Sequence, residues 1–106
     1  MNVKYIVILV TAKDKKEAVK IARGLLEAEL IACANILDGV LSLFRWQGKM
    51  DSAKEVLLVL KTKKNLFKKV SAKVKSLHSY QTPEIIALPL VDGSDDYLNW
   101  IGTSCV

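Results

Sequence analysis

The stretch Val40-Leu-Ser-Leu-Phe-Arg-Trp-Gln-Gly48 decides the fold, because it predicts one arm of a β-hairpin in the middle of the chain. Phe44 and Trp46 fall on one side of an alternating strand and leucines fall on the other, so both sides are largely apolar. Gln47-Gly48 is typical of the hairpin turn, and an apolar run centred on 56–60 predicts the returning strand. A strand that is apolar on both faces is not expected to lie at the edge of a sheet with one face in water.

The segments before the hairpin predict a strand, a helix and a second strand. The continuous β-branched run Tyr5-Ile-Val-Ile-Leu-Val10 indicates a central strand that is buried on both faces. Asp14 can cap a helix, and Glu17 three residues later completes a pattern like a capping box. Apolar residues then recur at spacings of three and four as far as Leu30, and the small apolar segment 31–36 follows.

The remaining segments complete the pattern on both sides of the hairpin. Asp38-Gly39 predicts a kink or β-bulge before the arm, and a second amphipathic helix is expected over about 65–77. The last strand, 84–91, contains Pro89, which lacks the N–H that a central strand needs and therefore indicates a sheet edge. A short helix over 95–103 closes the chain.

These elements follow the order βαββαβ with a short C-terminal helix. That order predicts the α+β class, as a ferredoxin-like sandwich with the helices on one face of the sheet. The 106 residues have room for one domain, which we expect to be 1–106. Hydrophobic residues make up 51% and the mean hydropathy is +0.23. These values are high for a small chain, and they indicate that an oligomer hides part of its surface.

Lysine accounts for most of the positive residues behind the net charge of +5. No acidic residue lies between Glu55 and Glu84, whereas seven lysines do. A solvated lysine surface is the ordinary explanation, although the summed field also attracts anions to that half of the domain. The run 56–60 has none of the aromatic residues that stack on RNA bases in this fold, so we expect no nucleic-acid partner.

The apolar stretches are far too short to span a membrane, and Met1-Asn-Val-Lys-Tyr5 lacks the layout of a signal peptide. Cys33 and Cys105 are too few and too scattered for a disulfide framework. We therefore expect a cytoplasmic protein with no membrane partner. Cys33 lies between alanines, which favours a buried small hydrophobe over a reactive thiolate.

Motifs of the common enzyme classes are absent from the sequence. The five glycines are isolated, so no phosphate-binding loop is formed, and no nucleophile can be paired with a base. Acylphosphatase, which shares this topology, needs an arginine in the loop after its first strand, where this chain reads Thr11-Ala-Lys-Asp14. We therefore expect no catalytic activity.

The candidate metal ligands lie after the second predicted helix. His78 is the only histidine and the only imidazole ligand available to a divalent metal, and Glu84 is a carboxylate that would help to complete the shell. No H-x-x-H or C-x-x-C spacing supplies further ligands. The alternative is that His78 only forms hydrogen bonds at the C-terminus of its helix, where the dipole favours it.

Several motifs, in order along almost the whole chain, resemble the CutA family of divalent-cation tolerance proteins. They are Ile31-Ala-Cys-Ala-Asn-Ile36, the segment Ser42 to Gly48 with its Phe-Arg-Trp-Gln-Gly, Glu55 with Leu60-Lys-Thr62, the segment His78 to Glu84, and Tyr97-Leu-Asn-Trp100. The resemblance implies a ferredoxin-like subunit with a long bent hairpin, assembled into a PII-like homotrimer whose sheets extend across subunits. It also implies a role in the response to copper and other divalent metal ions.

Departures from the family's pattern weaken the implied copper site. Some members carry a cysteine where Val10 stands and a second histidine where Leu77 stands, and both positions are associated with copper. The common His-Pro-Tyr-Glu run reads His78-Ser-Tyr-Gln81 in this chain. We therefore expect copper or another divalent cation to bind weakly, with neighbouring subunits completing the shell.

The sequence is consistent with two functions. The first is a homotrimeric metal-tolerance protein with Phe44 and Trp46 in the subunit interface. The second is a PII-like sensor or scaffold whose intersubunit clefts hold a small anion or a partner, with Lys61 and Tyr80 lining the cleft.

Overall fold

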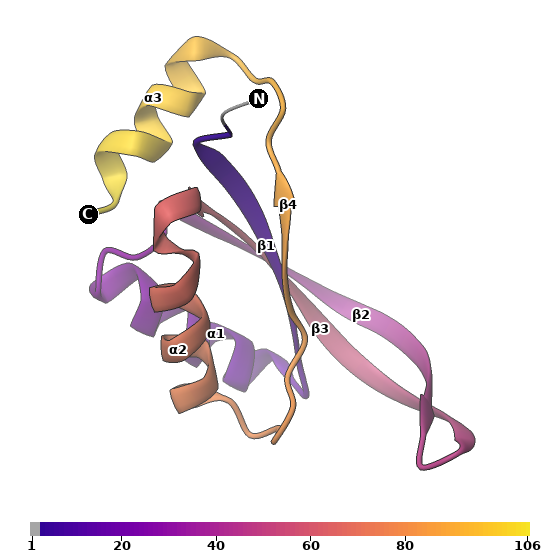
Figure 1. Ribbon diagram of the computed structural model, residues 1–106. Helices are drawn as coiled ribbons and strands as arrows, with labels where there is room; N and C mark the ends of the chain where they lie inside the picture. Colours follow the sequence, from indigo (N-terminus) through magenta and orange to yellow (C-terminus); the bar gives the residue numbers. More distant parts are fainter. Residues whose placement is uncertain (1–2) are drawn as a thin grey trace.

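The computed structural model describes residues 3–106 and has the expected βαββαβ order with a closing helix (Figure 1). Met1 and Asn2, which the expected domain 1–106 includes, lie outside the described residues. The elements are β1 (Tyr5–Ala12), α1 (Lys15–Glu27), β2 (Cys33–Trp46), β3 (Lys49–Lys63), a short 3₁₀ helix (Lys64–Leu66), α2 (Phe67–Leu77), β4 (Ile85–Pro89) and α3 (Asp95–Ser104).

The sheet has the strand order β2-β3-β1-β4, and each neighbouring pair is antiparallel. β4 is an edge strand, as Pro89 predicted. Helices α1 and α2 lie side by side on one face of the sheet, while α3 lies near the start of β1 (Figure 1). Among residues 3–106, no helix is both long enough and apolar enough to cross a membrane.

The core lies between the sheet and the helices α1 and α2. Ile6, Ile8 and Val10 of β1 are buried and face these helices, whereas Val7 and Leu9 are only half-buried. The expectation that β1 is buried on both faces is therefore wrong for the single chain. The reason is that both long helices cover the same face, so the alternating side chains meet no partner on the other face.

Helix α1 begins where the sequence predicted and ends earlier. The Asp14 carboxylate accepts a hydrogen bond from the Glu17 N–H at 2.8 Å, as an N-cap does. The helix ends at Glu27 rather than near Leu30, because Glu29 has a φ of 56° and turns the chain into the left-handed region.

Strands β2 and β3 form a long arm that projects beyond the helices (Figure 1). The strand register shifts between Leu37 and Val40, which confirms the kink expected at Asp38-Gly39, and Gly39 has a φ of 76°. At the tip, Gln47 and Gly48 both have positive φ, at 52° and 78°. Positive φ at both central residues is the type I′ geometry that matches the twist of a hairpin.

Candidate functional site

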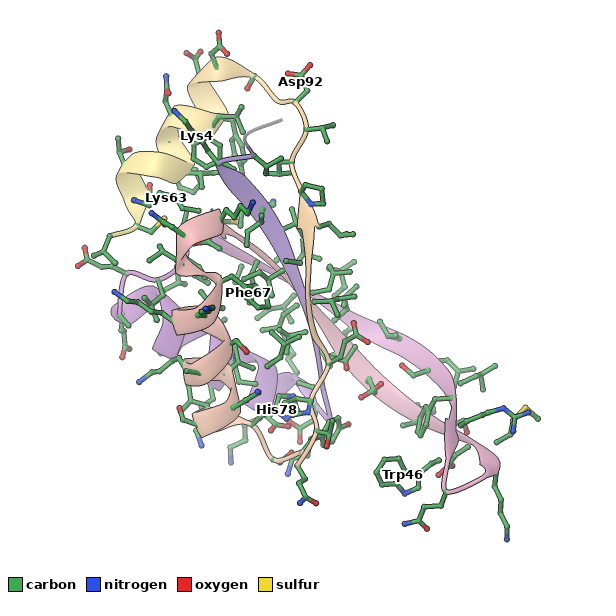
Figure 2. All side chains as sticks on the ribbon, viewed as in Figure 1. Lys4, Trp46, Lys63, Phe67, His78 and Asp92 are labelled. Carbon is green, nitrogen blue, oxygen red and sulfur yellow. The ribbon has the colours of Figure 1, made fainter. Side chains whose placement is uncertain are left out.

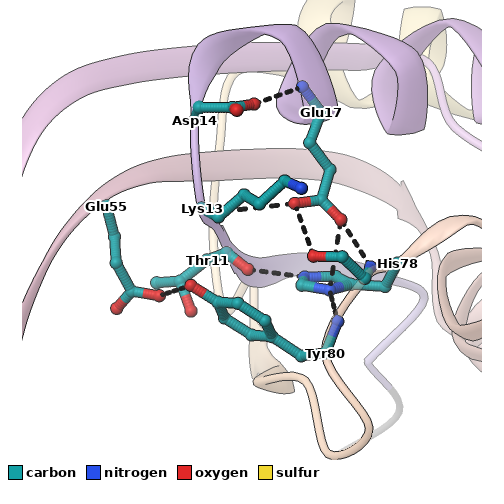
Figure 3. Close-up of polar contacts among 8 residues, drawn as sticks. Thr11, Lys13, Asp14, Glu17, Glu55, His78 and Tyr80 are labelled. Carbon is teal, nitrogen blue, oxygen red and sulfur yellow. Dashed lines mark hydrogen bonds and ion pairs between the residues drawn. The ribbon is translucent and has the colours of Figure 1, made fainter.

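His78 follows α2, and its ring lies between the end of β1 and the backbone of its own loop (Figure 3). Nε2 lies 2.7 Å from the carbonyl oxygen of Thr11, and Nδ1 accepts a hydrogen bond from the Tyr80 N–H at 3.0 Å. We therefore assign the neutral ring with its proton on Nε2, donating to Thr11. The side chain is fully buried, so both ring nitrogens are engaged within the protein.

Glu17 accepts hydrogen bonds from two segments at once (Figure 3). Its carboxylate accepts from the Ser79 N–H at 2.5 Å, from the Ser79 hydroxyl at 3.0 Å and from the Lys13 N–H at 3.3 Å. His78 Nδ1 lies 3.6 Å away, but this nitrogen already accepts from Tyr80, so the contact is not an ion pair in the neutral ring. Burial alone raises the pKa of Glu17, but the hydrogen bonds outweigh burial and hold that pKa below its ordinary value of 4.5.

Tyr80 links this loop to β3. Its hydroxyl donates to Glu55 Oε2 at 2.8 Å, and its ring lies 4.7 Å from the His78 ring between centroids. Burial, together with this hydrogen bond to the charged Glu55, raises the pKa of Tyr80 to about 12. The phenol is therefore a stable donor at neutral pH, and it satisfies one oxygen of a buried carboxylate.

A hollow of about 590 Å³ lies at the root of the β2–β3 arm, beside this network. It is lined by residues of β1, of both arm strands and of the segment before β4: Thr11, Ser42, Leu43, Phe44, Glu55, Tyr80, Thr82, Pro83 and Glu84. Two carboxylates and several hydroxyls face the hollow beside the apolar side chains of Leu43, Phe44 and Pro83, and no basic group is among these residues. The polar part of the lining therefore offers oxygen ligands of the kind that hard cations prefer. Within residues 3–106, no three His, Cys, Asp or Glu side chains converge as a ready metal site.

The structure brings together only some of the residues predicted from sequence. Phe44, Tyr80 and Glu84 line the hollow. His78 lines a different hollow and is linked to this one only through its ring contact with Tyr80. Lys61 lies elsewhere: its ammonium donates to Asn35 Oδ1 at 2.6 Å and sits 5.8 Å from the centre of the Tyr97 ring. Lys61 and Tyr80 therefore do not share a cleft within one chain.

Two carboxylates of the network have larger roles than the sequence predicted. Glu17 was expected only as part of a helix cap, and Glu55 only as part of a family motif. The available signal was Glu55 itself, because a charged residue beside the apolar run 56–60 needs a partner when it is buried. Its partner, Tyr80, is 25 residues further along the chain.

The face of the sheet opposite α1 and α2, here called the open face, is apolar and uncovered. Strand register places on it the side chains of Val7, Leu9, Leu37, Leu57, Val59, Ile86 and Leu88. Ile86 and Leu88 are each 50% exposed. On the arm, Trp46 is 59% exposed, and Figure 2 shows it far from the body of the domain. Apolar areas of this extent mark interaction surfaces.

Comparison with known proteins identifies the family. The model of the family described as CutA1 divalent ion tolerance protein matches residues 6–104. The divalent-cation tolerance protein CutA of Thermus thermophilus is 43% identical over 95 residues, which are 90% of this chain and 92% of that protein.

Solved structures show the same similarity in three dimensions. The Cut A1 structure from Thermus thermophilus superposes with a TM-score of 0.94 at 40% identity, covering 96% of this chain and 99% of the other. A structure described as the periplasmic divalent cation tolerance protein CutA of Archaeoglobus fulgidus gives 0.92 at 40% identity, with 94% and 97% covered. The chain therefore belongs to the CutA1 divalent ion tolerance family.

Proposed function

We propose that this protein acts as a homotrimer that binds divalent cations weakly in the response to metal ions. The relatives' names support a connection with divalent cations. The observation that carries the proposal for this chain is the hollow at the root of the arm, because the carboxylates Glu55 and Glu84 both line it. The proposed role is binding rather than catalysis, and the proposed compartment is the cytoplasm.

The open face supports the homotrimer. An isolated subunit of this size would leave Leu37, Ile86, Leu88 and the Trp46 ring in water, at the cost of solubility. Association would bury these side chains and bring the arm of one subunit against its neighbours. Each hollow lies at the root of an arm, so a neighbour could supply further ligands to it.

The metal ligands proposed first are Glu84, which is exposed, and His78. His78 can ligate a metal only by giving up its bond to Thr11 or the one from Tyr80, so its contribution costs a hydrogen bond. Glu55 is an added candidate, because only one of its oxygens receives the Tyr80 hydroxyl. With such a ligand set, affinity is modest, and Cu²⁺ binds more tightly than Zn²⁺ by the usual order for divalent metals.

Calorimetry on one purified sample tests the proposal with Cu²⁺, Zn²⁺ and ATP as separate titrants. We expect saturable Cu²⁺ binding at a fixed ratio to the trimer. Glu84→Gln should weaken it about tenfold or more, because even a group that only orients a metal ligand is worth about that much, while Glu27→Gln on α1 serves as the matched control. His78→Ala should also weaken it if the ring ligates. Equal Cu²⁺ binding by both variants and by the wild type would rule out Glu84 and His78 as metal ligands. A heat of binding with ATP, but none with Cu²⁺ or Zn²⁺, would favour the PII-like sensor instead.

A further inference from the structure

A second hollow lies between α2 and β4, near the start of β1. It measures about 480 Å³, and its walls are mainly apolar: Val3, Ile6, Phe67, Ala87 and Pro89. Figure 2 shows Phe67 between α2 and the sheet. Ile6 and Pro89 are register partners on the helix-covered face, so this groove is separate from the open face and from the arm. Its size is typical of small-molecule sites.

The rim of this groove carries unpaired positive charge. Lys64 and Lys68 line the groove itself, and Lys4 and Lys63 line an adjoining hollow that shares Val3, Lys64 and Asn65 with it. Among the described residues that line the two hollows, none is acidic. Within residues 3–106, none of these four ammonium groups lies in an ion pair. Their field therefore favours a negative group at the rim.

We propose that this groove binds a small amphiphilic anion, namely a carboxylate with a medium-length alkyl chain. The apolar walls favour binding of an alkyl chain, because the chain is removed from water when it packs against Ile6 and Phe67. The carboxylate would lie at the rim, where Lys64 and Lys68 supply charge-assisted hydrogen bonds. An inorganic anion would leave the walls in water, and a neutral amphiphile would leave the ammonium groups without a partner. This binding uses none of the residues proposed for metal, so either proposal can fail alone.

Titration of the full-length protein with sodium octanoate, followed by calorimetry and by amide NMR shifts, tests this site. We expect saturable binding of one octanoate per chain, with the largest shifts at Ile6, Phe67 and Ala87. Lys64→Gln/Lys68→Gln should weaken it about fivefold or more, from the loss of two charged contacts. Lys69→Gln/Lys75→Gln removes the same charge from α2 outside the groove and should leave the affinity unchanged.

Two further experiments distinguish the contribution of the groove's shape from the contribution of the ligand's charge. Ala87→Leu places a larger side chain at an exposed position of the groove wall and should abolish the shifts while leaving the circular dichroism spectrum intact. Octanamide, which has the same chain without the charge, should bind at least about fivefold more weakly. Equal octanoate binding by the two lysine double variants would overturn the proposal. So would largest shifts on the open face, equal binding of octanamide, or the absence of saturable binding.

Discussion

Glu17 is the residue at which the start of α1 and the loop after α2 are joined. Ser79 gives it a backbone and a hydroxyl hydrogen bond across 62 residues of sequence, and Lys13 adds a third. A buried carboxylate with three donors is stabilised in its charged form, which is why its pKa is lowered despite burial.

The lowered pKa of Glu17 makes stability depend on acid pH. The unfolded carboxyl, near 4.5, takes up a proton before the folded one does, so its contribution is present above that pH. It is lost as the pH falls from 4.5 through the lower folded pKa. Glu17→Gln should cost roughly 1–3 kcal/mol at pH 7 and should flatten this acid slope. Urea unfolding at several pH values and one fixed protein concentration measures both, with the exposed Glu27→Gln as the control. An unchanged acid slope in Glu17→Gln would contradict the assignment.

The raised pKa of Tyr80 makes stability depend on alkaline pH, opposite to the acid dependence expected from Glu17. Its folded pKa of about 12 lies above the ordinary 10.0, so its contribution is fully present below pH 10 and is lost as the pH rises through 12. Tyr80→Phe leaves the Glu55 oxygen without this donor and should cost about 1–2 kcal/mol at neutral pH. Phenolate absorbance after a rapid pH jump should show one of the three tyrosines ionising near pH 12 in wild type, and that step should vanish in the variant. Its persistence would mean that another tyrosine is the buried one.

At the scale of elements, the β2–β3 arm depends on two local backbone conformations. The bulge at Gly39 shifts the strand register of the arm, and the Gln47-Gly48 turn closes the arm with positive φ at both residues. Glycine adopts this region freely, whereas glutamine is less suited to it.

The turn residues therefore have opposite expected effects. Gly48→Ala should lower the free energy of unfolding by about 1 kcal/mol, because alanine is strained at a φ of 78°. Gln47→Asn should raise it by about 0.3–0.5 kcal/mol, because asparagine tolerates left-handed φ. Ser52→Ala, within the arm but outside the turn, is the control. Denaturant unfolding measures all three, and a stabilising Gly48→Ala would rule out this turn geometry.

At the scale of the whole molecule, the helices and the open face give the sheet two unequal sides. Cys33 shows the consequence, because it is half-buried in the single chain rather than buried as expected. It lies beside Lys61 on the open face, whereas Cys105 is buried near Thr62. The fold of one chain therefore does not predict slow labelling of Cys33, and we expect it only where a neighbouring subunit covers the open face.

The assembly prediction follows from the same asymmetry. Sedimentation equilibrium at micromolar concentration should give the mass of three subunits, and Cys33 should react slowly with thiol reagents in that state. Trp46→Ala should weaken association by roughly 2–4 kcal/mol per ring if the ring anchors the interface. Leu26→Ala removes an exposed apolar side chain from α1 instead and is the control. A monomeric mass, or fast labelling of Cys33 in the trimer, would contradict the prediction.

Local patterns were sufficient for much of the fold. The hairpin turn, the bulge at Asp38-Gly39, the cap at Asp14 and the edge position of Pro89 each depend on backbone chemistry within a few residues. The same holds for the order of the elements, because hydrophobic periodicity reports the period of the backbone directly. Residues Phe44, Tyr80 and Glu84 could also be selected as candidates from sequence and resemblance.

The sequence by itself therefore determined the elements, their order and the family, because these follow from local periodicity and from motifs in a fixed order. Only the tertiary structure decided which side chains meet. The contacts of Glu17 with Ser79 and of Glu55 with Tyr80 join residues that are 62 and 25 positions apart. Lys61 and Tyr80, which were predicted to line one cleft, lie in different parts of the chain's surface. Such pairings depend on how strands and helices pack in space, which side-chain type and local spacing do not encode.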